Sequence, residues 1–269
     1  MNGMCNFFGI SRAAYYAWCQ RINRPDPDRE RKHYVVEAYQ ESRKRYGYRR
    51  ISLWLRKKRS VIINHKAVLR LMNRLGIHSV ARQRKPFQKM SQLPIYHCYE
   101  NVLLRNFNAS RPNQKWVTDI TYVATGQGFA YLAVIKDLFD GFIVAHKLSH
   151  DNSVALVTHT LQQALQKEMA TDGLILHSDQ GHQYTSHAYH VLTQQYNIIP
   201  SMSRRGNCWD NAPMENFFSH LKEEALRHIK ITSFEEARNV VDEYINFFNY
   251  ERLQLKTKQT PYEVRCLST

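Results

Sequence analysis

The sequence predicts an α/β fold, a mixed β-sheet flanked by helices, preceded by a basic all-α region of the helix-turn-helix type. Charge is the first observation behind this prediction: residues 1–111 hold 24 Lys and Arg against 6 Asp and Glu, whereas residues 112–269 hold 14 against 17. The second is the pattern after Gln114, where runs of β-branched and aromatic residues alternate with helical periodicity, as in sheets covered by helices. With 269 residues, the chain is long enough for one large domain or two smaller ones.

The basic front half is predicted to consist of short helices. Helical patterns run over 10–21, over about 29–44, from the glycine turn at 46–51 onward, and from Asn64 to Gly76. Short helices joined by tight turns, with many basic side chains, are compatible with a helix-turn-helix module.

The charge of this half predicts contact with DNA. A net charge of +15 and a pI near 9.7 indicate a polyanionic partner, most often nucleic acid, with an anionic membrane surface as the alternative. The last helix of the basic half is the better candidate to enter a groove, through Lys66, Arg70 or Arg74. Arg49 and Arg50 are further candidate contacts. The plainer alternative is a solvated basic bundle without groove contact.

Composition divides the chain into four parts. Residues 1–26 form an N-terminal helical segment, 27–79 the basic helix-turn-helix-like domain, 80–112 a linker, and 113–269 the sheet domain with a C-terminal helical extension. The linker is assigned from its polar side chains, its prolines and its lack of periodicity.

No segment resembles a membrane anchor or an export signal. There is no run of about 18 apolar residues, and the first ten residues lack the charged region and long apolar stretch of a signal peptide. The five cysteines are scattered and form no CxxC pair, so neither a zinc ribbon nor a disulfide framework is expected. We therefore expect a reduced, cytoplasmic protein without membrane contact.

The second half is predicted to alternate strands and helices. Helices are expected over 153–168, with Asp151 or Asn152 as the cap, and over 186–196. Sites in such sheets gather at the carboxyl ends of strands. Strands are expected over 116–123, 128–137, 141–148, 173–179 and 197–202.

Three carboxylates in this half are candidate metal ligands. Asp119 lies within an apolar strand, where aspartate is depleted, and Asp179 ends another strand. Glu215 follows Asp179 after 35 intervening residues, and Lys222, two helical turns further, shares its helix face. Two divalent ions held by such carboxylates can activate a nucleophile and neutralise the leaving oxygen of a phosphodiester. The pattern favours phosphoryl transfer on nucleic acid.

Each of these carboxylates also has a plainer interpretation. Asp179 precedes a glycine turn that an aspartate commonly pins. Glu215 could be an ordinary first-turn glutamate favoured by the helix dipole. Asp119 could pair with one of the many arginines.

Neighbouring polar residues are weaker candidates. Asp137 and Asp140 flank a turn and are expected to be structural. His177 alternates onto the strand face of Asp179, although a buried histidine with satisfied hydrogen bonds is commoner than a ligand. The loop that carries Arg204 and Arg205 is expected beside the site, where it could touch DNA.

Several segments together resemble a known family. They are 116–122 (WVTDITY), 176–186 (LHSDQGHQYTS), 203–223 (SRRGNCWDNAPMENFFSHLKE), 11–18 (SRAAYYAW) and 46–51 (YGYRRI). In these motifs the chain resembles the catalytic protein of bacterial insertion sequences of the IS-three family, the second-frame (orfB-type) product. That group is similar to retroviral integrases, with a ribonuclease-H-like core and a DDE triad.

The resemblance implies a DDE transposase with an integrase-type catalytic domain. Asp119, Asp179 and Glu215 would be the catalytic residues and would bind two ions of Mg²⁺ or Mn²⁺. Lys222 would contact DNA. Water would cleave at the element's end to expose a 3′-OH, and that 3′-OH would attack a second phosphodiester.

The resemblance also implies partners and a setting. The expected partners are the element ends, target DNA, further copies of the chain on DNA, and an upstream-frame protein or fusion; the setting is the bacterial nucleoid. The sequence departs from the family's pattern at His182, where a serine is common, and over 248–254, which puts the role of the C-terminal segment in question.

Two other functions compete with this one. A sequence-specific DNA-binding regulator with an inactive ribonuclease-H-like domain would bind DNA without nicking it. A general ribonuclease-H-like nuclease would cut DNA but never join it, which the basic helical front weakly disfavours.

Overall fold

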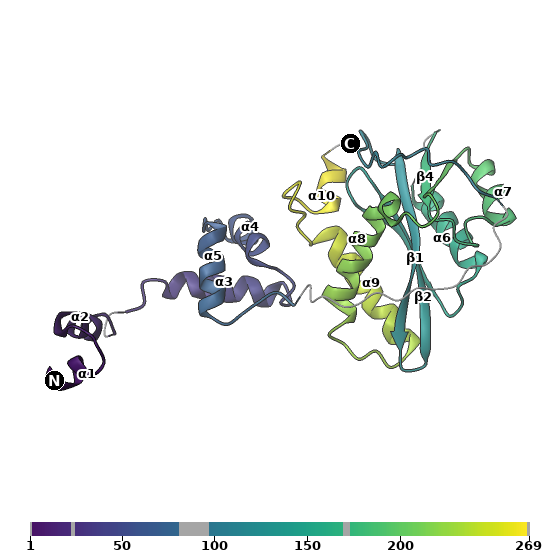
Figure 1. Cartoon of the computed structure of the whole chain (residues 1–269). Coiled ribbons are helices and arrows are strands. Elements are labelled where there is room, and N and C mark those ends of the chain that lie inside the picture. The colour runs from purple at the N-terminus through teal and green to yellow at the C-terminus, as the bar shows by residue number, and fades with distance from the viewer. Residues whose placement is uncertain (1, 23–24, 81–96, 169–172, 268–269) are drawn as a thin grey trace. The chain divides into compact units, whose positions relative to one another are not determined.

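A computed structural model describes residues 2–22, 25–80, 97–168 and 173–267 (Figure 1). The chain divides into two compact units, an N-terminal unit, Met1–Ser79, and a sheet unit, Val80–Thr269. None of the described helices combines the length and apolar composition needed to cross a membrane.

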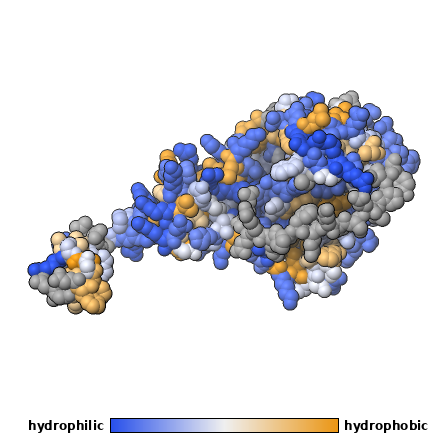
Figure 2. Space-filling model, in the orientation of Figure 1, coloured by the Kyte–Doolittle hydropathy of each residue, from blue (hydrophilic) through white to orange (hydrophobic). Residues whose placement is uncertain are grey.

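The N-terminal unit is all helical, as predicted. Ser11 precedes α2, and its Oγ accepts a hydrogen bond from Ala14 N at 3.1 Å. The surface over α3–α5 is largely hydrophilic, whereas α1 and α2 expose apolar side chains (Figure 2). The helices are α1 (Asn2–Phe7), α2 (Arg12–Ile22), α3 (Arg29–Glu41), α4 (Tyr48–Arg59) and α5 (His65–Arg74).

Helices α3, α4 and α5 share one small core. Asn64 caps α5, its side chain accepting from Lys66 N at 2.9 Å, and Gly76 follows the helix with φ +65. Helix α3 is shorter than predicted because Arg43 and Lys44 adopt positive φ and cannot continue it. The core residues are Val35, Ala38, Ile51, Leu55, Val68, Leu71 and Met72.

The sheet unit contains a five-stranded mixed sheet with the order β3-β2-β1-β4-β5. β1, β2 and β3 are antiparallel neighbours, whereas β4 and β5 run parallel to β1. The strands are β1 (Lys115–Thr125), β2 (Gly128–Asp137), β3 (Ile143–Ser149), β4 (Ile175–Ser178) and β5 (Ile199–Met202). The helices are α6 (Val154–Lys167), α7 (His187–Gln195), α8 (Ala212–Leu221), α9 (Phe234–Tyr250) and α10 (Pro261–Cys266), with a short 3-10 helix η1 (Cys208–Asn211) and a short π-helix η2 (Lys222–Leu226).

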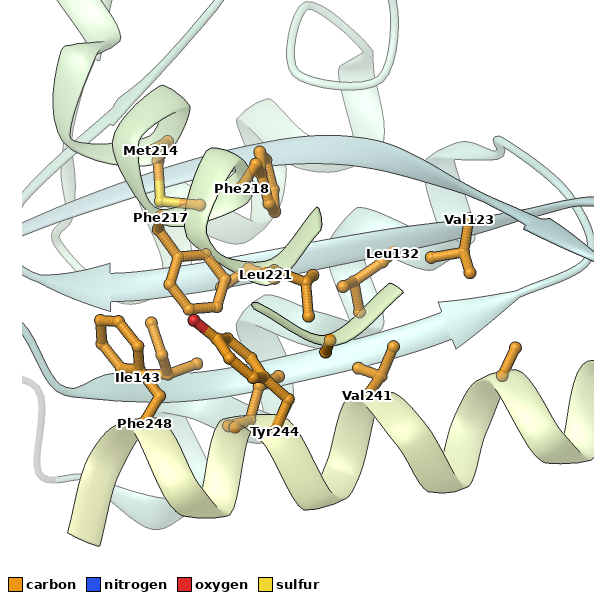
Figure 3. Packing of buried hydrophobic residues seen from close by; sticks show 14 of the residues in the cluster. Val123, Leu132, Ile143, Met214, Phe217, Phe218, Leu221, Val241, Tyr244 and Phe248 are labelled. Atoms are coloured by element: carbon orange, nitrogen blue, oxygen red, sulfur yellow. The ribbon is translucent and has the colours of Figure 1, made fainter. Parts of the chain in front are cut away.

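Helices cover both faces of this sheet (Figure 1). On one face α6 and α7 bury residues such as Val157 and Leu192 against Trp116. On the other, α8 and α9 pack on the strands (Figure 3). Because the apolar face of each helix is removed from water, both layers are fixed to the strands that carry the candidate site. The second face is lined by Val123, Leu132, Ile143, Met214, Phe217, Phe218, Leu221, Val241, Tyr244 and Phe248.

The cap of α6 differs from the prediction. Ser153, rather than Asp151 or Asn152, caps the helix, its Oγ accepting from Leu156 N at 3.3 Å. A capping side chain must reach an N–H two or three residues later, and the helix begins at Val154. Asn152 instead accepts a hydrogen bond from the Gln183 side chain.

Residues 97–112 pack on the sheet unit, although the sequence suggested a linker over 80–112; residues 81–96 of that linker lie outside the described part. Leu103 is buried among α8 and α9 side chains, and its N donates to Ser201 Oγ at 3.1 Å. Met202 N, at the end of β5, donates to Glu100 O at 3.2 Å. This segment, here called the strap, is thus tied to β5.

The C-terminal helix is clamped by three carboxylates. Arg265 lies 2.7 Å from Asp137 Oδ2, 2.7 Å from Asp140 Oδ2 and 2.5 Å from Glu168 Oε1. Its guanidinium also lies 4.7 Å from the centre of the Phe142 ring. Asp137 and Asp140 are therefore structural, as expected.

Candidate active site

The two candidate aspartates lie at the same level on neighbouring strands. In the parallel pair of β1 and β4, Val117 is opposite His177. Asp119 and Asp179 each follow two residues later, so they stand beyond that pair at a strand spacing of roughly 5 Å. Side chains alternate along a strand, and Val117 faces α8 and α9. The register thus places both carboxylates on the face that α8 covers.

A glycine holds the second aspartate. Gly181 N donates to Asp179 Oδ1 at 2.9 Å. A Cβ at position 181 would lie 2.9 Å from that oxygen and 3.1 Å from Gln183 Oε1. Any other residue here must displace the Asp179 carboxylate or the turn behind it. Asp179 therefore does pin the glycine turn, as the plainer interpretation proposed, and the same turn orients its carboxylate in the candidate site.

Glu215 lies in the first turn of α8. Met214, Phe217 and Leu221 face the sheet, whereas Glu215 is exposed. Asn211 begins this helix, but its side chain makes no capping bond. Its Nδ2 donates instead to Thr118 O at 3.2 Å, which ties the start of α8 to β1 beside Asp119.

The other two carboxylates act electrostatically on Asp119. Burial raises the pKa of Asp119 well above its ordinary value, and the negative charges of Asp179 and Glu215 raise it further. The hydrogen bond from Ile120 N and the charge of Lys222 oppose this rise. Burial also raises the pKa of Asp179, against the Gly181 hydrogen bond and the charge of His182. A cation between these groups would relieve their repulsion.

The carboxylates are neighbours rather than a closed coordination shell. Within the described part of the chain, no three His, Cys, Asp or Glu side chains gather tightly enough to enclose a metal ion. The donor set nevertheless consists of carboxylate oxygens on separate elements, which suits hard divalent cations that keep several waters.

Lys222 directly follows α8, as the first residue of η2, and reaches back toward β1. Its Nζ is 4.6 Å from the centre of the Tyr122 ring. Burial lowers the pKa of Lys222, and the charge of Asp119 opposes that shift. Lys222 and Glu215 therefore both affect the pKa of Asp119, in opposite directions, as expected of two residues on one helix face beside β1.

A buried ion pair holds η2, the helical turn that begins at Lys222. In η2, Glu224 accepts from Arg252 Nε at 2.8 Å and from Arg252 Nη2 at 2.7 Å. Tyr244 of α9 donates to Glu224 Oε2 at 3.1 Å, and His220 Nδ1 lies 3.3 Å from Oε1. The Arg252 hydrogen bonds hold the pKa of Glu224 low despite its burial. Sequence reasoning missed this pair because nothing in the pattern distinguishes Glu224 from an exposed helical glutamate.

Arg204 is engaged within its own loop. Asp210, fully buried, accepts from Arg204 Nε at 2.9 Å and from Arg204 Nη2 at 3.0 Å. Two residues of the strap also donate to the Asp210 carboxylate: Arg105 Nε at 2.7 Å and Asn101 Nδ2 at 3.1 Å. The Arg204 hydrogen bonds are the main reason that the pKa of Asp210 is lowered. Arg205, the neighbouring prediction, is exposed.

The remaining predicted basic contacts belong to the N-terminal unit. Arg70 Nη2 and Arg74 Nη1 lie 3.3 Å and 3.2 Å from Asp28 Oδ2, with more than half of each side chain exposed. Lys66, one turn before Arg70, is also exposed. Helix α5 thus presents a basic surface to solvent.

Arg49 and Arg50 lie at the start of α4, beside aromatic rings. The Arg49 guanidinium is 5.5 Å from the Tyr48 ring centre, and that of Arg50 is 6.0 Å from the Tyr46 ring centre.

His177 is a core histidine, not a ligand. Its Nδ1 is 2.8 Å from Ser201 Oγ and its Nε2 is 3.0 Å from Ser203 Oγ. Burial lowers its pKa to about 4, so the ring is neutral at physiological pH. The plainer interpretation of this residue is confirmed.

Comparison with known proteins identifies the family. The Integrase core domain family matches residues 109–208, a second model of that name matches 215–267, and the HTH-like domain matches 25–85. The Escherichia coli K12 protein InsK of insertion sequence element IS150 is 37% identical over 257 residues, 95% of this chain and 90% of the relative. The E. coli transposase InsF of IS3A is 35% identical over 91% of this chain and 86% of its own length. The chain belongs to the IS150/IS3 family of insertion-sequence transposases.

The transposase has the integrase fold. It aligns with a chain of the simian T-cell lymphotropic virus intasome structure at a TM-score of 0.51 and 15% identity, over 85% of the transposase and 73% of that chain. This likeness confirms the predicted ribonuclease-H-like sheet.

Family membership also establishes the kind of enzyme. The transposase is a polynucleotidyl transferase that cuts DNA strands and transfers them, and enzymes with this core use divalent metal ions. DNA is the partner of both matched domains. A regulator with an inactive domain is not favoured.

Proposed function

We propose that the transposase acts at the ends of its own insertion sequence, with Asp119, Asp179 and Glu215 as the catalytic residues. One observation carries the assignment: the parallel register of β1 and β4 sets Asp119 beside Asp179, and the bond from Asn211 to β1 brings the start of α8, which bears Glu215, to the same place. Burial, together with the charges of Asp179 and Glu215, raises the pKa of Asp119, in keeping with this convergence.

The same three residues are the proposed metal ligands. Their oxygen donors fit Mg²⁺ or Mn²⁺, and three carboxylates on different elements suit two ions. When bound, such ions would favour attack on the phosphodiester by water or a 3′-OH and neutralise charge on the leaving oxygen.

The chain's own residues orient this chemistry. Gly181 fixes one Asp179 oxygen, and Ile120 N holds Asp119 Oδ1 at 2.8 Å. Lys222, whose ammonium lies 4.6 Å from the Tyr122 ring centre and interacts electrostatically with Asp119, is positioned to contact a backbone phosphate of the strand being cut. The Glu224–Arg252 pair anchors the turn from which Lys222 projects.

The N-terminal unit supplies DNA recognition in this proposal. Helix α5 enters a groove with Lys66, Arg70 and Arg74, of which the last two are oriented by Asp28. Arg49 and Arg50 contact the phosphate backbone.

In the sheet unit, Arg205 is a further proposed DNA contact. Arg204 holds the loop that carries Arg205 through its hydrogen bonds to Asp210. For the domains we keep 1–26, 27–79, 80–112 and 113–269 as functional divisions, with the strap packed on the last.

Further partners follow from the reaction. Two element ends must be brought together for transposition, so we infer an assembly of several copies of the chain on DNA. An upstream-frame protein or fusion is a further proposed partner.

The test is strand cleavage on an oligonucleotide duplex that carries the element end, with Mg²⁺ or Mn²⁺. Asp119→Asn, Asp179→Asn and Glu215→Gln should each reduce nicking below detection while leaving DNA binding largely unchanged. Glu235→Gln, at an exposed position of α9, is the matched control and should cleave normally. Retained cleavage in any triad variant contradicts the assignment. Cutting without joining by the wild-type chain indicates a nuclease, and binding without cutting indicates a regulator.

A further inference from the structure

Two large aromatic side chains are exposed together near the triad. Tyr122 of β1 and Phe129 of β2 are 51% and 59% exposed. Their ring centres are 5.3 Å apart at an interplanar angle of 79°, an edge-to-face contact. Their neighbours Val123 and Leu132 point into the core (Figure 3). The two aromatic side chains therefore lie on the surface of two strands whose inward-facing residues already fill the core.

The strand edge at this pair is open on one side. β4 pairs with β1 only over Lys115–Val117, so no described strand covers β1 at Tyr122 on that side. Tyr122 follows Asp119 by three residues, roughly 10 Å along β1. Because side chains alternate, Tyr122 and Phe129 lie on the opposite face of the sheet from Asp119, so a nucleic-acid strand that joins the triad to the pair passes around this open edge, where Lys222 contacts Tyr122.

Lys222 connects the pair to the triad. Its Nζ lies 4.6 Å from the Tyr122 ring centre, and its charge acts on Asp119. Among the described residues Lys222 is in no ion pair, so an aromatic ring rather than a carboxylate holds the ammonium. A cation held this way keeps hydrogen-bond donors for a phosphate.

Exposed rings beside a cation have the chemistry of a single-strand site. Nucleobases stack on aromatic side chains while cationic groups follow the backbone, and this recognition is tolerant of sequence. Inside a duplex both faces of each base are already stacked, so such a site acts on bases that have left the stack.

We propose that Tyr122 and Phe129 form a stacking platform for an unpaired nucleobase of the strand that enters the triad, with Lys222 on an adjoining phosphate. This inference rests on the proposed function, because it takes the triad as the place of cleavage. Stacking there offsets part of the free energy of opening base pairs near the scissile bond, so the platform matters most for a fully paired end.

The first test measures binding without catalysis. The full chain is titrated, in EDTA, with a 12-nucleotide single strand and with the same strand made of abasic sites. Phosphate contacts are common to both probes, so the affinity ratio reports base stacking. The wild type should prefer the strand with bases, and Tyr122→Ala or Phe129→Ala should reduce that preference about five-fold or more.

Two further variants make this test specific. Tyr122→Trp should keep the preference, because it keeps an aromatic face. Tyr196→Ala, which removes a 42% exposed tyrosine elsewhere on the sheet unit, should match the wild type. Equal affinity of the wild type for the two probes, or an unchanged preference in both alanine variants, overturns the platform.

The second test measures cleavage at paired and at pre-opened element ends. Tyr122→Ala should lose about five-fold or more of its rate on the fully paired end and recover most of it when the terminal base pairs are mismatched. An equal loss on both substrates contradicts a role in holding an unpaired base.

The outcomes separate this inference from the proposed function. If Asp119→Asn still cleaves, the triad assignment fails, whereas the binding test in EDTA still decides whether the platform exists. If the triad variants are inactive and Tyr122→Ala behaves as the wild type in both tests, the platform alone is wrong.

Discussion

Two groups of three carboxylates lie in the sheet unit, and they differ in what neutralises them. Asp137, Asp140 and Glu168 surround the Arg265 guanidinium. The other group is the triad, where burial and the charges of Asp179 and Glu215 raise the pKa of Asp119, and the charge of Lys222 opposes this rise only in part.

The contrast shows what makes an acidic cluster functional. Burial raises the pKa of Asp137 to about 6, so the clamped group is also perturbed. The clamp nevertheless carries its own cation in the chain, at hydrogen-bond distance from all three side chains. The triad has an excess of negative charge, which a divalent ion would neutralise.

The largest expected effect follows from breaking the clamp. Arg265→Met leaves Asp137 and Asp140 buried without their cation, so it should lower the free energy of unfolding by about 3–5 kcal/mol. Lys222→Met should change it by less than about 1 kcal/mol, because Lys222 is in no described ion pair. Urea denaturation at pH 7 measures both. Similar losses in the two variants would mean that the triad, too, depends on its lysine for stability.

A pH dependence is expected from His177. Its folded-state pKa, about 4, lies below its ordinary value, so protonation favours the unfolded chain. The contribution is complete above about pH 6.5 and is lost as pH falls toward 4, by up to roughly 3 kcal/mol.

The His177→Gln variant isolates this term. The wild type minus His177→Gln difference in unfolding free energy should shrink between pH 6.5 and 4. The aspartates with raised pKa act in the opposite direction but are common to both proteins. A difference that is constant with pH would mean that folding does not lower the pKa of His177.

A smaller effect on stability, but a clear one on activity, is expected at Gly181. Gly181→Ala introduces a Cβ against Asp179 Oδ1, so the carboxylate must move. We expect about 1 kcal/mol or less of destabilisation and at least a ten-fold loss of strand cleavage. Gly173→Ala is the contrasting variant, since its Cβ would meet no atom within 4 Å; it should cost some stability because of its positive φ but leave cleavage intact. Equal cleavage by both variants would contradict the orientation of Asp179 by residue 181.

Much of this architecture was predictable because it depends on local pattern. The run at 128–137 is a strand over the predicted residues, since β-branched and aromatic residues end at defined turns. The triad could be proposed from the sequence for two reasons. An aspartate such as Asp119 is uncommon in an apolar strand, and Glu215 and Lys222 follow Asp179 at a telling spacing.

What escaped prediction depends on contacts between distant segments. Glu224 and Arg252 are charged residues, which are normally exposed, and only the folded chain shows that they neutralise each other in the core. Leu103 of the strap is a lone apolar residue in a segment without periodicity, so nothing local indicates that it is buried. The role of Arg204 likewise depends on Asp210, whose burial follows from the loop's path.

The most direct test of the central claim is a Mn²⁺ titration of the full chain, followed by the shift in melting temperature. The account predicts that Mn²⁺ raises the melting temperature of the wild type, because the ion binds the folded state. Asp119→Asn and Asp179→Asn should abolish the rise, whereas Asp242→Asn, at an exposed position of α9, should keep it. A rise of the same size in the triad variants would show that the ion binds elsewhere and would contradict the account.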